Sequence, residues 1–283
     1  MKYTSIKSVV KRGFRYVVKG VPDKKNVVVN ISYISPSERL KGKNIIVTGG
    51  SRGLGLAMAK RFVLEKANVL ITGRNVQILK ERAKEIGCHY LLLDVQDVKS
   101  FDDFFVNAEK VLGGCIDYLV NNAGISLHEK TFLDVTLNNF DSQISTNFRG
   151  MFFMTQKYVE RYRINEMTQG KVLFISSETS ITVDERPYGL TKAAVNSLVQ
   201  GLAFRYIKEG IRINALAPGV TSSDMTGFSV KGDLYIKNHT SDRVYLPEEV
   251  AEIASFLLSD ASNLLNGQIL VCNEGNTINA RWK

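Results

Sequence analysis

Short apolar runs alternate with amphipathic stretches through most of the chain. The apolar runs have the length of β-strands and fall at residues 44–48, 68–72, 89–95, 116–120, 171–176, 211–216 and 267–272. The stretches between them carry apolar residues at helical spacing and fall at residues 54–66, 76–86, 98–112, 137–163, 187–208 and 247–258. Apolar strands alternating with helices predict an α/β fold, a doubly wound, Rossmann-like parallel sheet covered on both faces.

The first 39 residues follow a different pattern. Apolar and polar side chains alternate over 13–20 and over 26–34, and a polar loop, VPDKKN, separates the two runs. This pattern predicts a β-hairpin. Because so short a segment cannot build a core of its own, we expect it to pack on the main domain or on another subunit. The prediction is therefore a single catalytic domain, residues 40–283, with an N-terminal hairpin extension, residues 1–39.

The net charge of +9 comes from the N-terminal segment. Residues 1–43 hold 11 basic and 2 acidic side chains, and the rest of the chain holds 26 of each. The basic residues are scattered, which is typical of a solvated surface, so no nucleic-acid partner is expected. The alternative is a patch that attracts an acidic partner, such as anionic lipid, nucleic acid or an acidic carrier protein.

Composition places the chain among globular proteins, with 44% hydrophobic and 23% charged residues. No apolar run approaches the ~20 residues of a membrane-spanning helix. Cys88, Cys115 and Cys272 are too widely spaced for a metal cluster and fit a reducing compartment. We therefore expect a cytoplasmic protein without a membrane span or a metal site. An organelle-import signal in the basic N-terminus is the alternative.

A glycine-rich stretch, TGGSRGLG at 48–55, lies between the first predicted strand and the first predicted helix. Glycines there permit a tight turn and let backbone amides approach a pyrophosphate at the positive end of the helix. In this position the stretch predicts a dinucleotide site. The alternative is a turn that only allows the helix to pack closely on the strand.

Further motifs follow in a fixed order: NNAG at 121–124, Asn147 within STNFRG, YxxxK from Tyr188 to Lys192, and a Pro-Gly pair at 218–219. With the TGxxxGxG spacing of the glycines, the chain resembles the short-chain dehydrogenase/reductase family from about Leu40 to the C-terminal region. The resemblance implies hydride transfer between a nicotinamide dinucleotide and a small carbonyl or alcohol substrate. It also implies a homodimer or homotetramer assembled through the long helices.

The predicted proton donor is Tyr188. Tyr188 and Lys192 are four residues apart on a predicted helix and therefore adjacent on one face. A tyrosine hydroxyl has a pKa near ~10, so it is a poor proton partner at neutral pH unless a neighbouring cation lowers it. Taken alone, such a pair is more often an ordinary surface pair. The resemblance implies that it is catalytic and that Lys192 also holds the nicotinamide ribose.

Two more catalytic residues are implied by the resemblance. Ser177 takes the place of the serine that hydrogen-bonds the substrate oxygen, and its neighbour Ser176 is expected to point the other way along the strand. Asn147 is implied to support a water-linked proton path to Lys192. The alternative for Asn147 is a buried side chain that bonds only backbone.

The expected cofactor is NADP. An acidic residue after the second strand would bind a ribose 2′-hydroxyl, but that place reads Thr72-Gly73-Arg74-Asn75. Within the resemblance, Arg74 and Arg52 imply a 2′-phosphate, since guanidinium groups suit phosphate oxygens. The alternative is that Arg74 points to solvent. The full set of expected cofactor contacts is Gly49, Ser51, Arg52, Gly53, Leu54, Gly55, Arg74, Asp94, Val95, Asn121, Ala123, Gly124, Tyr188, Lys192, Pro218, Gly219, Val220 and Ser223.

Two segments are expected to shape the substrate site. Tyr188 follows Ser177 by 11 residues, a shorter loop than is usual in the family, so the substrate wall is expected to differ. Residues 222–246 are expected to form a lid.

The prediction is an NADP(H)-dependent oxidoreductase that reduces a ketone or runs in reverse, on a ketoacyl-carrier substrate or on a ketosugar or polysaccharide precursor. One alternative is a catalytically silent dinucleotide-binding scaffold that recruits a partner through the hairpin. Another, a sugar-nucleotide epimerase or dehydratase, is disfavoured by the TGxxxGxG spacing.

Overall fold

The computed structural model describes residues 38–229, 232–237 and 239–278. The chain separates into two compact units, Met1–Asn30 and Ile31–Lys283, and every described residue belongs to the second. The hairpin predicted at 13–20 and 26–34 lies outside the described residues.

Seven parallel strands form the central sheet, which confirms the predicted fold class. They are β1 (Asn44–Val47), β2 (Asn68–Gly73), β3 (His89–Leu92), β4 (Tyr118–Asn121), β5 (Gly170–Ile175), β6 (Ile211–Pro218) and β7 (Ile269–Cys272). Their order is β3-β2-β1-β4-β5-β6-β7, and all neighbours pair in parallel. The order reverses between β1 and β4, and it is at such a reversal that open α/β sheets bind ligands.

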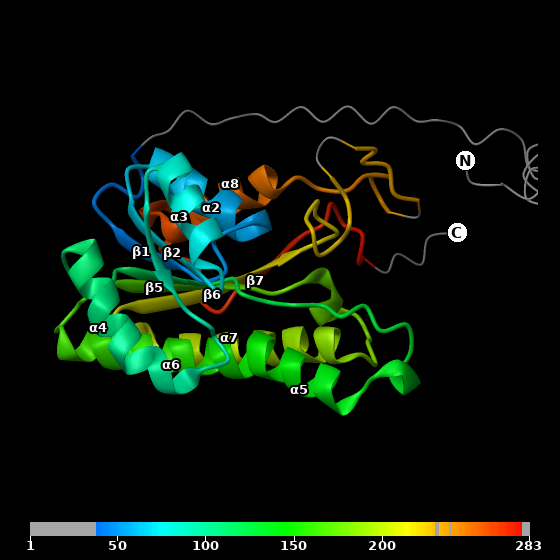
Figure 1. The fold of residues 1–283 in the computed structure, drawn as a ribbon, viewed down its shortest axis with the longest axis horizontal. Helices are drawn as coiled ribbons and strands as arrows, with labels where there is room; N and C mark the ends of the chain where they lie inside the picture. Colours follow the sequence, from blue (N-terminus) through cyan, green and yellow to red (C-terminus); the bar gives the residue numbers. More distant parts are fainter. Residues whose placement is uncertain (1–37, 230–231, 238, 279–283) are drawn as a thin grey trace, which may run out of the picture. The chain divides into compact units, whose positions relative to one another are not determined.

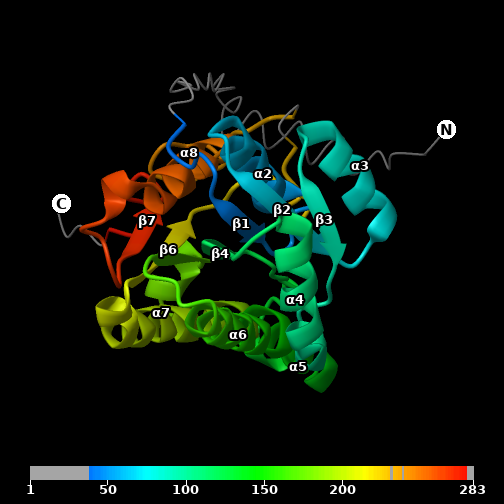
Figure 2. The same cartoon turned by 90° about the vertical axis from the view of Figure 1, so that its left-hand side faces the viewer.

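Helices cover both faces of the sheet (Figures 1 and 2). On one face lie α2 (Gly53–Leu64), α3 (Val76–Ile86) and α8 (Pro247–Leu258). On the other lie α4 (Phe101–Leu112), α5 (Leu137–Ile144), α6 (Met151–Ile164) and α7 (Pro187–Tyr206). In the described part of the chain, no helix has the length and apolar character needed to cross a membrane.

Each face of the sheet has its own core. In β1, Ile45 and Val47 belong to the buried cluster that contains Phe62 of α2. Between them, Ile46 belongs to the opposite cluster, which contains Phe105 of α4. Successive strand residues point to opposite faces, so a strand buried on both sides needs apolar residues at every position. This explains why the strands read as continuous apolar runs.

The helix predicted over 137–163 is interrupted. Between α5 and α6 the chain forms a π-helical turn, Ser145–Gly150, which carries Asn147. A Cβ on Gly150 would lie 2.6 Å from the carbonyl oxygen of Val95, so only glycine lets this turn approach the segment after β3. The apolar period could not reveal the interruption, because a single wide turn leaves helix on both sides.

Candidate active site

The turn between β1 and α2 folds back on itself tightly. Gly49 has a left-handed φ of 65°, and a Cβ on Gly55 would lie 2.3 Å from the carbonyl oxygen of Gly49. The residue before α2, Arg52, makes no side-chain cap hydrogen bond to the helix. The backbone amides of Gly53 and Leu54 at the start of the helix are therefore not occupied by that side chain. Such amides can donate to a bound anion. This cradle fits the pyrophosphate of a dinucleotide.

A hydrogen-bonded clamp joins this turn to the end of β4. The Thr48 hydroxyl oxygen accepts from the backbone amides of Asn122 (3.0 Å) and Ala123 (3.1 Å). The Asn122 amide donates to the carbonyl oxygens of Thr48 (2.8 Å) and Gly49 (3.1 Å). Sequence reasoning selected neither Thr48 nor Asn122. The only signal for Asn122 was the asparagine doublet in NNAG.

The side chain of Asn121 does not face the cradle. It is buried and donates from Nδ2 to the hydroxyl oxygen of Thr155 on α6, 2.8 Å away. Neighbouring residues at a strand end point in opposite directions, so Asn122 faces the glycine turn while Asn121 faces the core. The Asn121 side chain therefore does not point to the cradle, and a contact between its backbone and the cofactor stays a prediction.

The two arginines expected to bind a 2′-phosphate lie near the ends of β1 and β2. Arg74 follows β2 and is exposed. Ser51 also lies at the end of β2, because its Oγ is 3.4 Å from the position that a Cβ on Gly73 would occupy. The Arg52 Nη1 atom is 3.4 Å from Asp224 Oδ2, and both side chains are exposed. Such exposed ion pairs contribute little, so Arg52 is available to a stronger anion.

The expected adenine contacts follow β3. The Asp94 carboxylate accepts from the backbone amide of Gln96 (3.0 Å), and Val95 is buried. Their contact with adenine stays a prediction.

The four predicted catalytic residues converge near Gly124, at the end of β4. Asn147 Oδ1 and Lys192 Nζ lie 3.4 and 3.6 Å from where a Cβ on Gly124 would stand. Lys192 Nζ is 5.7 Å from the centre of the Tyr188 ring, and the Ser177 hydroxyl forms a hydrogen bond with Tyr188. Three chain segments, after β4, in the π-helical turn and around the start of α7, are thus brought together.

Asn147 is fully buried and bound to the segment after β4. Its Nδ2 donates to the carbonyl oxygen of Ile125, and its Oδ1 accepts from the amide of Ile125, both at 2.8 Å. A third contact, 3.3 Å long, joins Nδ2 to the Thr191 hydroxyl on α7. These bonds are those of the alternative interpretation, a buried asparagine that bonds backbone. The proton-path role stays a prediction.

The two serines after β5 make different contacts. The Ser176 hydroxyl donates to Asn196 Oδ1 on α7 at 2.7 Å. The Ser177 hydroxyl oxygen accepts from the backbone amide and the hydroxyl of Thr179, at 3.3 and 3.0 Å, and also bonds Tyr188. Of the two, only Ser177 contacts the predicted proton donor. Its role toward substrate stays a prediction.

Burial dominates the electrostatics of the Tyr188–Lys192 pair. Burial raises the pKa of Tyr188; its hydrogen bond with Ser177 lowers that pKa, and the negative charge of Glu178 raises it. Burial lowers the pKa of Lys192 to about 8. The effect expected of Lys192, a lower pKa for Tyr188, is therefore opposed by desolvation, which disfavours both charged forms. Tyr188 is held in its protonated form at neutral pH.

The segment after β6 lies against the glycine turn. The turn at 218–219 ends β6, and the carbonyl oxygen of Val220 accepts from the amide of Tyr245 at 2.9 Å. Ser223 Cβ is 3.6 Å from where a Cβ on Gly53 would stand. Val220 and Ser223 thus lie at the same edge of the sheet as the cradle.

The loops around the site touch one another. His128 Nε2 is 2.6 Å from the carbonyl oxygen of Met225 in the predicted lid segment. The backbone amide of Phe132 donates to the Glu185 carboxylate at 3.1 Å, in the short loop between Ser177 and Tyr188. Segments that follow β4, β5 and β6 therefore contact one another at this end of the sheet. That the short acidic loop forms a wall of the substrate site stays a prediction.

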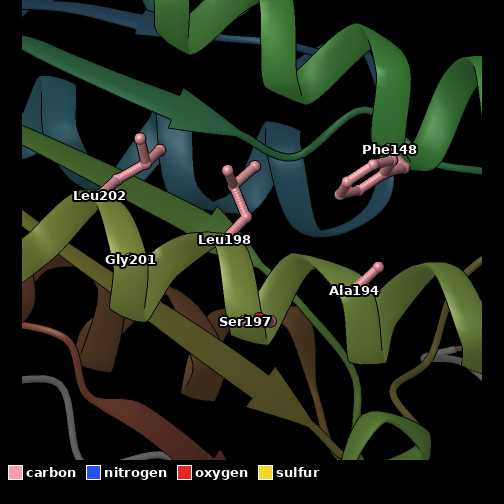
Figure 3. Close-up of a pocket in the computed structure, with 6 residues that line it drawn as sticks. All are labelled: Phe148, Ala194, Ser197, Leu198, Gly201 and Leu202. Carbon is pink, nitrogen blue, oxygen red and sulfur yellow. The ribbon is translucent and has the colours of Figure 1, made fainter.

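A separate pocket lies along α7 (Figure 3). Its lining residues are Phe148, Ala194, Ser197, Leu198, Gly201 and Leu202. Leu198, Leu202 and Phe148 point into it from α7 and the π-helical turn. None of the predicted catalytic residues lines it.

Comparisons with known proteins agree with this geometry. The family model described as enoyl-(acyl carrier protein) reductase matches residues 49–277. Gluconate 5-dehydrogenase from Gluconobacter oxydans is 34% identical over 250 residues, which cover 84% of this chain and 96% of that protein.

Two solved structures are similar throughout the described domain. One is a short-chain dehydrogenase from Burkholderia cenocepacia in complex with NADP, with a TM-score of 0.75 and 27% identity, covering 84% of this chain and 99% of that one. The other is 3-ketoacyl-(acyl-carrier-protein) reductase from Brucella melitensis complexed with NADH, with a TM-score of 0.78 and 28% identity, covering 84% and 100%.

We expect Gly55→Ala to disrupt the cradle. The added Cβ would meet backbone rather than a flexible side chain, so the free energy of unfolding should fall by ~1–3 kcal/mol and dinucleotide binding should weaken. Urea denaturation and calorimetric titration with NADPH would measure both. The control is Gly201→Ala on α7, where nothing lies within 4 Å and the helix should gain ~0.5–1 kcal/mol. Equal behaviour of the two variants would contradict the prediction.

Proposed function

This chain belongs to the short-chain dehydrogenase/reductase family, and on that premise we propose that it is an NADP(H)-dependent oxidoreductase that interconverts a ketone and its alcohol. The observation that supports the proposal most is the position of Lys192 and Asn147 beside Gly124, with Tyr188 and Ser177 adjoining them. This group lies at the sheet edge that also carries the glycine turn. A cradle and a proton donor at one edge are what hydride transfer to a carbonyl requires.

In the proposed reaction, Ser177 donates a hydrogen bond that orients the substrate carbonyl, and Tyr188 gives its proton to the developing alkoxide. Burial keeps Tyr188 protonated until then. Lys192 is held by the carbonyl oxygen of Ile175, 2.7 Å from Nζ, and carries its charge below pH 8 or so. The cofactor, bound at the glycine turn, would supply the hydride.

NADP is the cofactor we propose, because Arg52 and Arg74 lie at the ends of β1 and β2 where an acidic residue would favour NAD. The two similar structures carry NADP in one case and NADH in the other, so the preference depends on this chain's own residues.

The names of similar proteins suggest two substrate classes. One similar enzyme is named for gluconate and another for a 3-ketoacyl group on a carrier protein. We propose a ketone substrate of one of these classes. Oxidation of gluconate and reduction of a 3-oxoacyl thioester, assayed in parallel, would separate them.

We also propose a homodimer or homotetramer that uses the face formed by α5, α6 and α7. Large apolar side chains are exposed there: Phe140, Phe152, Leu190 and Phe204. The apolar pocket of Figure 3 lies along α7 and the π-helical turn between α5 and α6. Exposed apolar side chains gathered on one face are typical of a protein interface.

Replacing Tyr188 with Phe tests the proton donor. Removing a positioned proton donor typically costs ~10²–10⁴-fold in rate, so turnover should fall by about that factor while NADPH binding is retained. Steady-state kinetics on the better substrate and calorimetric titration would measure the two. Tyr206→Phe, at the end of the same helix, is the matched control and should keep full activity. Near-normal turnover of Tyr188→Phe, or cofactor binding without turnover of any carbonyl by the wild type, would contradict the proposal. The second result would favour a binding scaffold.

Replacing Arg74 with Ala tests the cofactor preference. Loss of a charge-assisted hydrogen bond to phosphate should weaken NADPH binding about tenfold or more and leave NADH binding unchanged. Thermal shifts with each dinucleotide would measure this. Arg82→Ala is the control, since Arg82 is exposed on α3 and paired with Glu85. A larger shift of the wild type with NADH than with NADPH would overturn the choice of NADP.

The proposed assembly is tested by Phe204→Lys. Phe204 is 88% exposed, so a lysine there should leave the fold intact while it places a charge in the interface. Light scattering coupled to size exclusion should report a smaller species than for the wild type. Leu264→Lys is the control, because Leu264 is 99% exposed and lies outside α5, α6 and α7. A wild type that elutes as a monomer would refute the proposal.

A further inference from the structure

Arg243 is the centre of an ion-pair network in the segment that leads into α8. Its side chain is largely buried, at 15% exposed. Nη1 and Nη2 each lie 2.8 Å from a carboxylate oxygen of Glu249 on α8, and Nη2 also lies 2.9 Å from Oε1 of Glu274, which follows β7. A guanidinium fork bound on two sides has a fixed orientation as well as a fixed position. Arg243 therefore joins the start of α8 to the segment after β7.

The guanidinium of Arg243 lies over the ring of Tyr245, 4.9 Å from the ring centre. Such a cation over an aromatic face is attractive, and it fixes the plane of the ring when the cation is itself held. Tyr245 is 4% exposed, and a Cβ on Gly219 would lie 2.6 Å from Tyr245 Cε2. The ring therefore packs directly on the backbone of the turn that follows β6.

The backbone of Tyr245 holds the same segment. Its amide donates to the carbonyl oxygen of Val220, and its carbonyl oxygen accepts from the amide of Ser222, both at 2.9 Å. Between these two bonds, Thr221 and Tyr245 form a β-bridge. Tyr245 thus fixes residues 219–222 through its ring at one end and through its backbone along the rest.

Residues 219–222 lie on the side of the sheet toward which the nicotinamide half of a dinucleotide would extend. The glycine turn follows β1, and Arg74 and Asp94 follow β2 and β3 on one side of it. Ser177 and residues 219–222 follow β5 and β6 on the other side. A dinucleotide with its pyrophosphate at the glycine turn and its adenosine at the ends of β2 and β3 therefore directs its nicotinamide toward β5 and β6.

We propose that Arg243 is a positioning residue for the nicotinamide half of the cofactor. Held by Glu249 and Glu274, it fixes Tyr245, and Tyr245 holds residues 219–222 where the nicotinamide end is bound. This inference rests on the proposed function, since it takes the ligand to be NADP(H) bound across this edge of the sheet. It adds a set of residues, distant from the glycine turn, that acts on one half of the cofactor only.

Arg243→Met tests the inference with two ligands. Methionine keeps much of the apolar length of the side chain and removes the fork. The Kd for NADPH should rise about tenfold, whereas that for adenosine 2′,5′-bisphosphate, which has no nicotinamide, should change by less than about twofold. Calorimetric titration would measure both. Unchanged NADPH binding, or an equal loss of both ligands, would overturn the inference; the second result would mean that the whole domain has loosened.

Two variants serve as controls. Arg163→Met removes a similar but more exposed arrangement, in which Arg163 binds both carboxylate oxygens of Glu209 at 2.7 and 2.8 Å and lies 5.5 Å from the centre of the Tyr206 ring. It should leave both Kd values in place. Arg243→Lys keeps the charge without the fork, so its Kd for NADPH should fall between those of the wild type and Arg243→Met. An NADPH loss in Arg163→Met as large as in Arg243→Met would contradict the inference.

The route through Tyr245 is tested by a double-mutant cycle. Tyr245→Phe keeps the ring and should bind NADPH like the wild type, whereas Tyr245→Ala should resemble Arg243→Met. If Arg243 acts through this ring, the double variant Arg243→Met/Tyr245→Ala should bind NADPH no more weakly than the weaker single variant. Losses that add in the double variant would overturn the route.

These binding measurements keep the inference distinct from the proposed function, because they require no turnover. With a working substrate, misplacing the nicotinamide in Arg243→Met should also lower kcat/KM by on the order of 10²-fold. Absence of turnover in the wild type would count against the proposed function alone, and the comparison of NADPH with adenosine 2′,5′-bisphosphate would still decide the role of Arg243.

Discussion

The site depends on one constraint, the reversal of strand order between β1 and β4. From β1 the chain continues to β2 and β3 on one side of β1, and then returns to form β4 on the other side. The carboxyl ends of β1 and β4 are therefore adjacent, and no connecting helix passes over them. Thr48 and Asn122 join the two ends through five hydrogen bonds between side chain and backbone. The glycine turn is thereby held open at the helix start, and the segment after β4 is directed toward Asn147.

Burial gives the rest of the site its chemical character. A tyrosine and a lysine in water would titrate near one another, but here desolvation raises the pKa of Tyr188 and lowers that of Lys192 to about 8. As the pH rises, Lys192 therefore loses its proton before Tyr188 does, so the two do not form a tyrosinate–ammonium ion pair. Glu178 adds to this effect at Tyr188, whereas Ser177 opposes it. A donor kept protonated suits carbonyl reduction, and the same groups serve the reverse reaction at higher pH.

Most of the fold followed from local patterns. The parallel strands are buried on both faces, so they appear as unbroken apolar runs, and helix α7 begins at Pro187, where proline suits the first turn. The π-helical turn Ser145–Gly150 did not follow, since it depends on how closely Gly150 approaches Val95. Hydrophobic period carries no information on such a contact between segments.

The sequence by itself determined the fold class, the glycine turn and the identity of the residues that surround Gly124. These features depend on which residues follow each strand and at what spacing, and both can be seen along the chain. Only the tertiary structure decided which of two neighbours faces the site. Asn122 rather than Asn121 meets the glycine turn, whereas the choice of Ser177 over Ser176 was already made from the sequence. It also revealed Arg243, whose partners lie on α8 and after β7. The physical reason is that side-chain direction, burial and electrostatic environment arise between segments distant in the chain, and no local pattern encodes them.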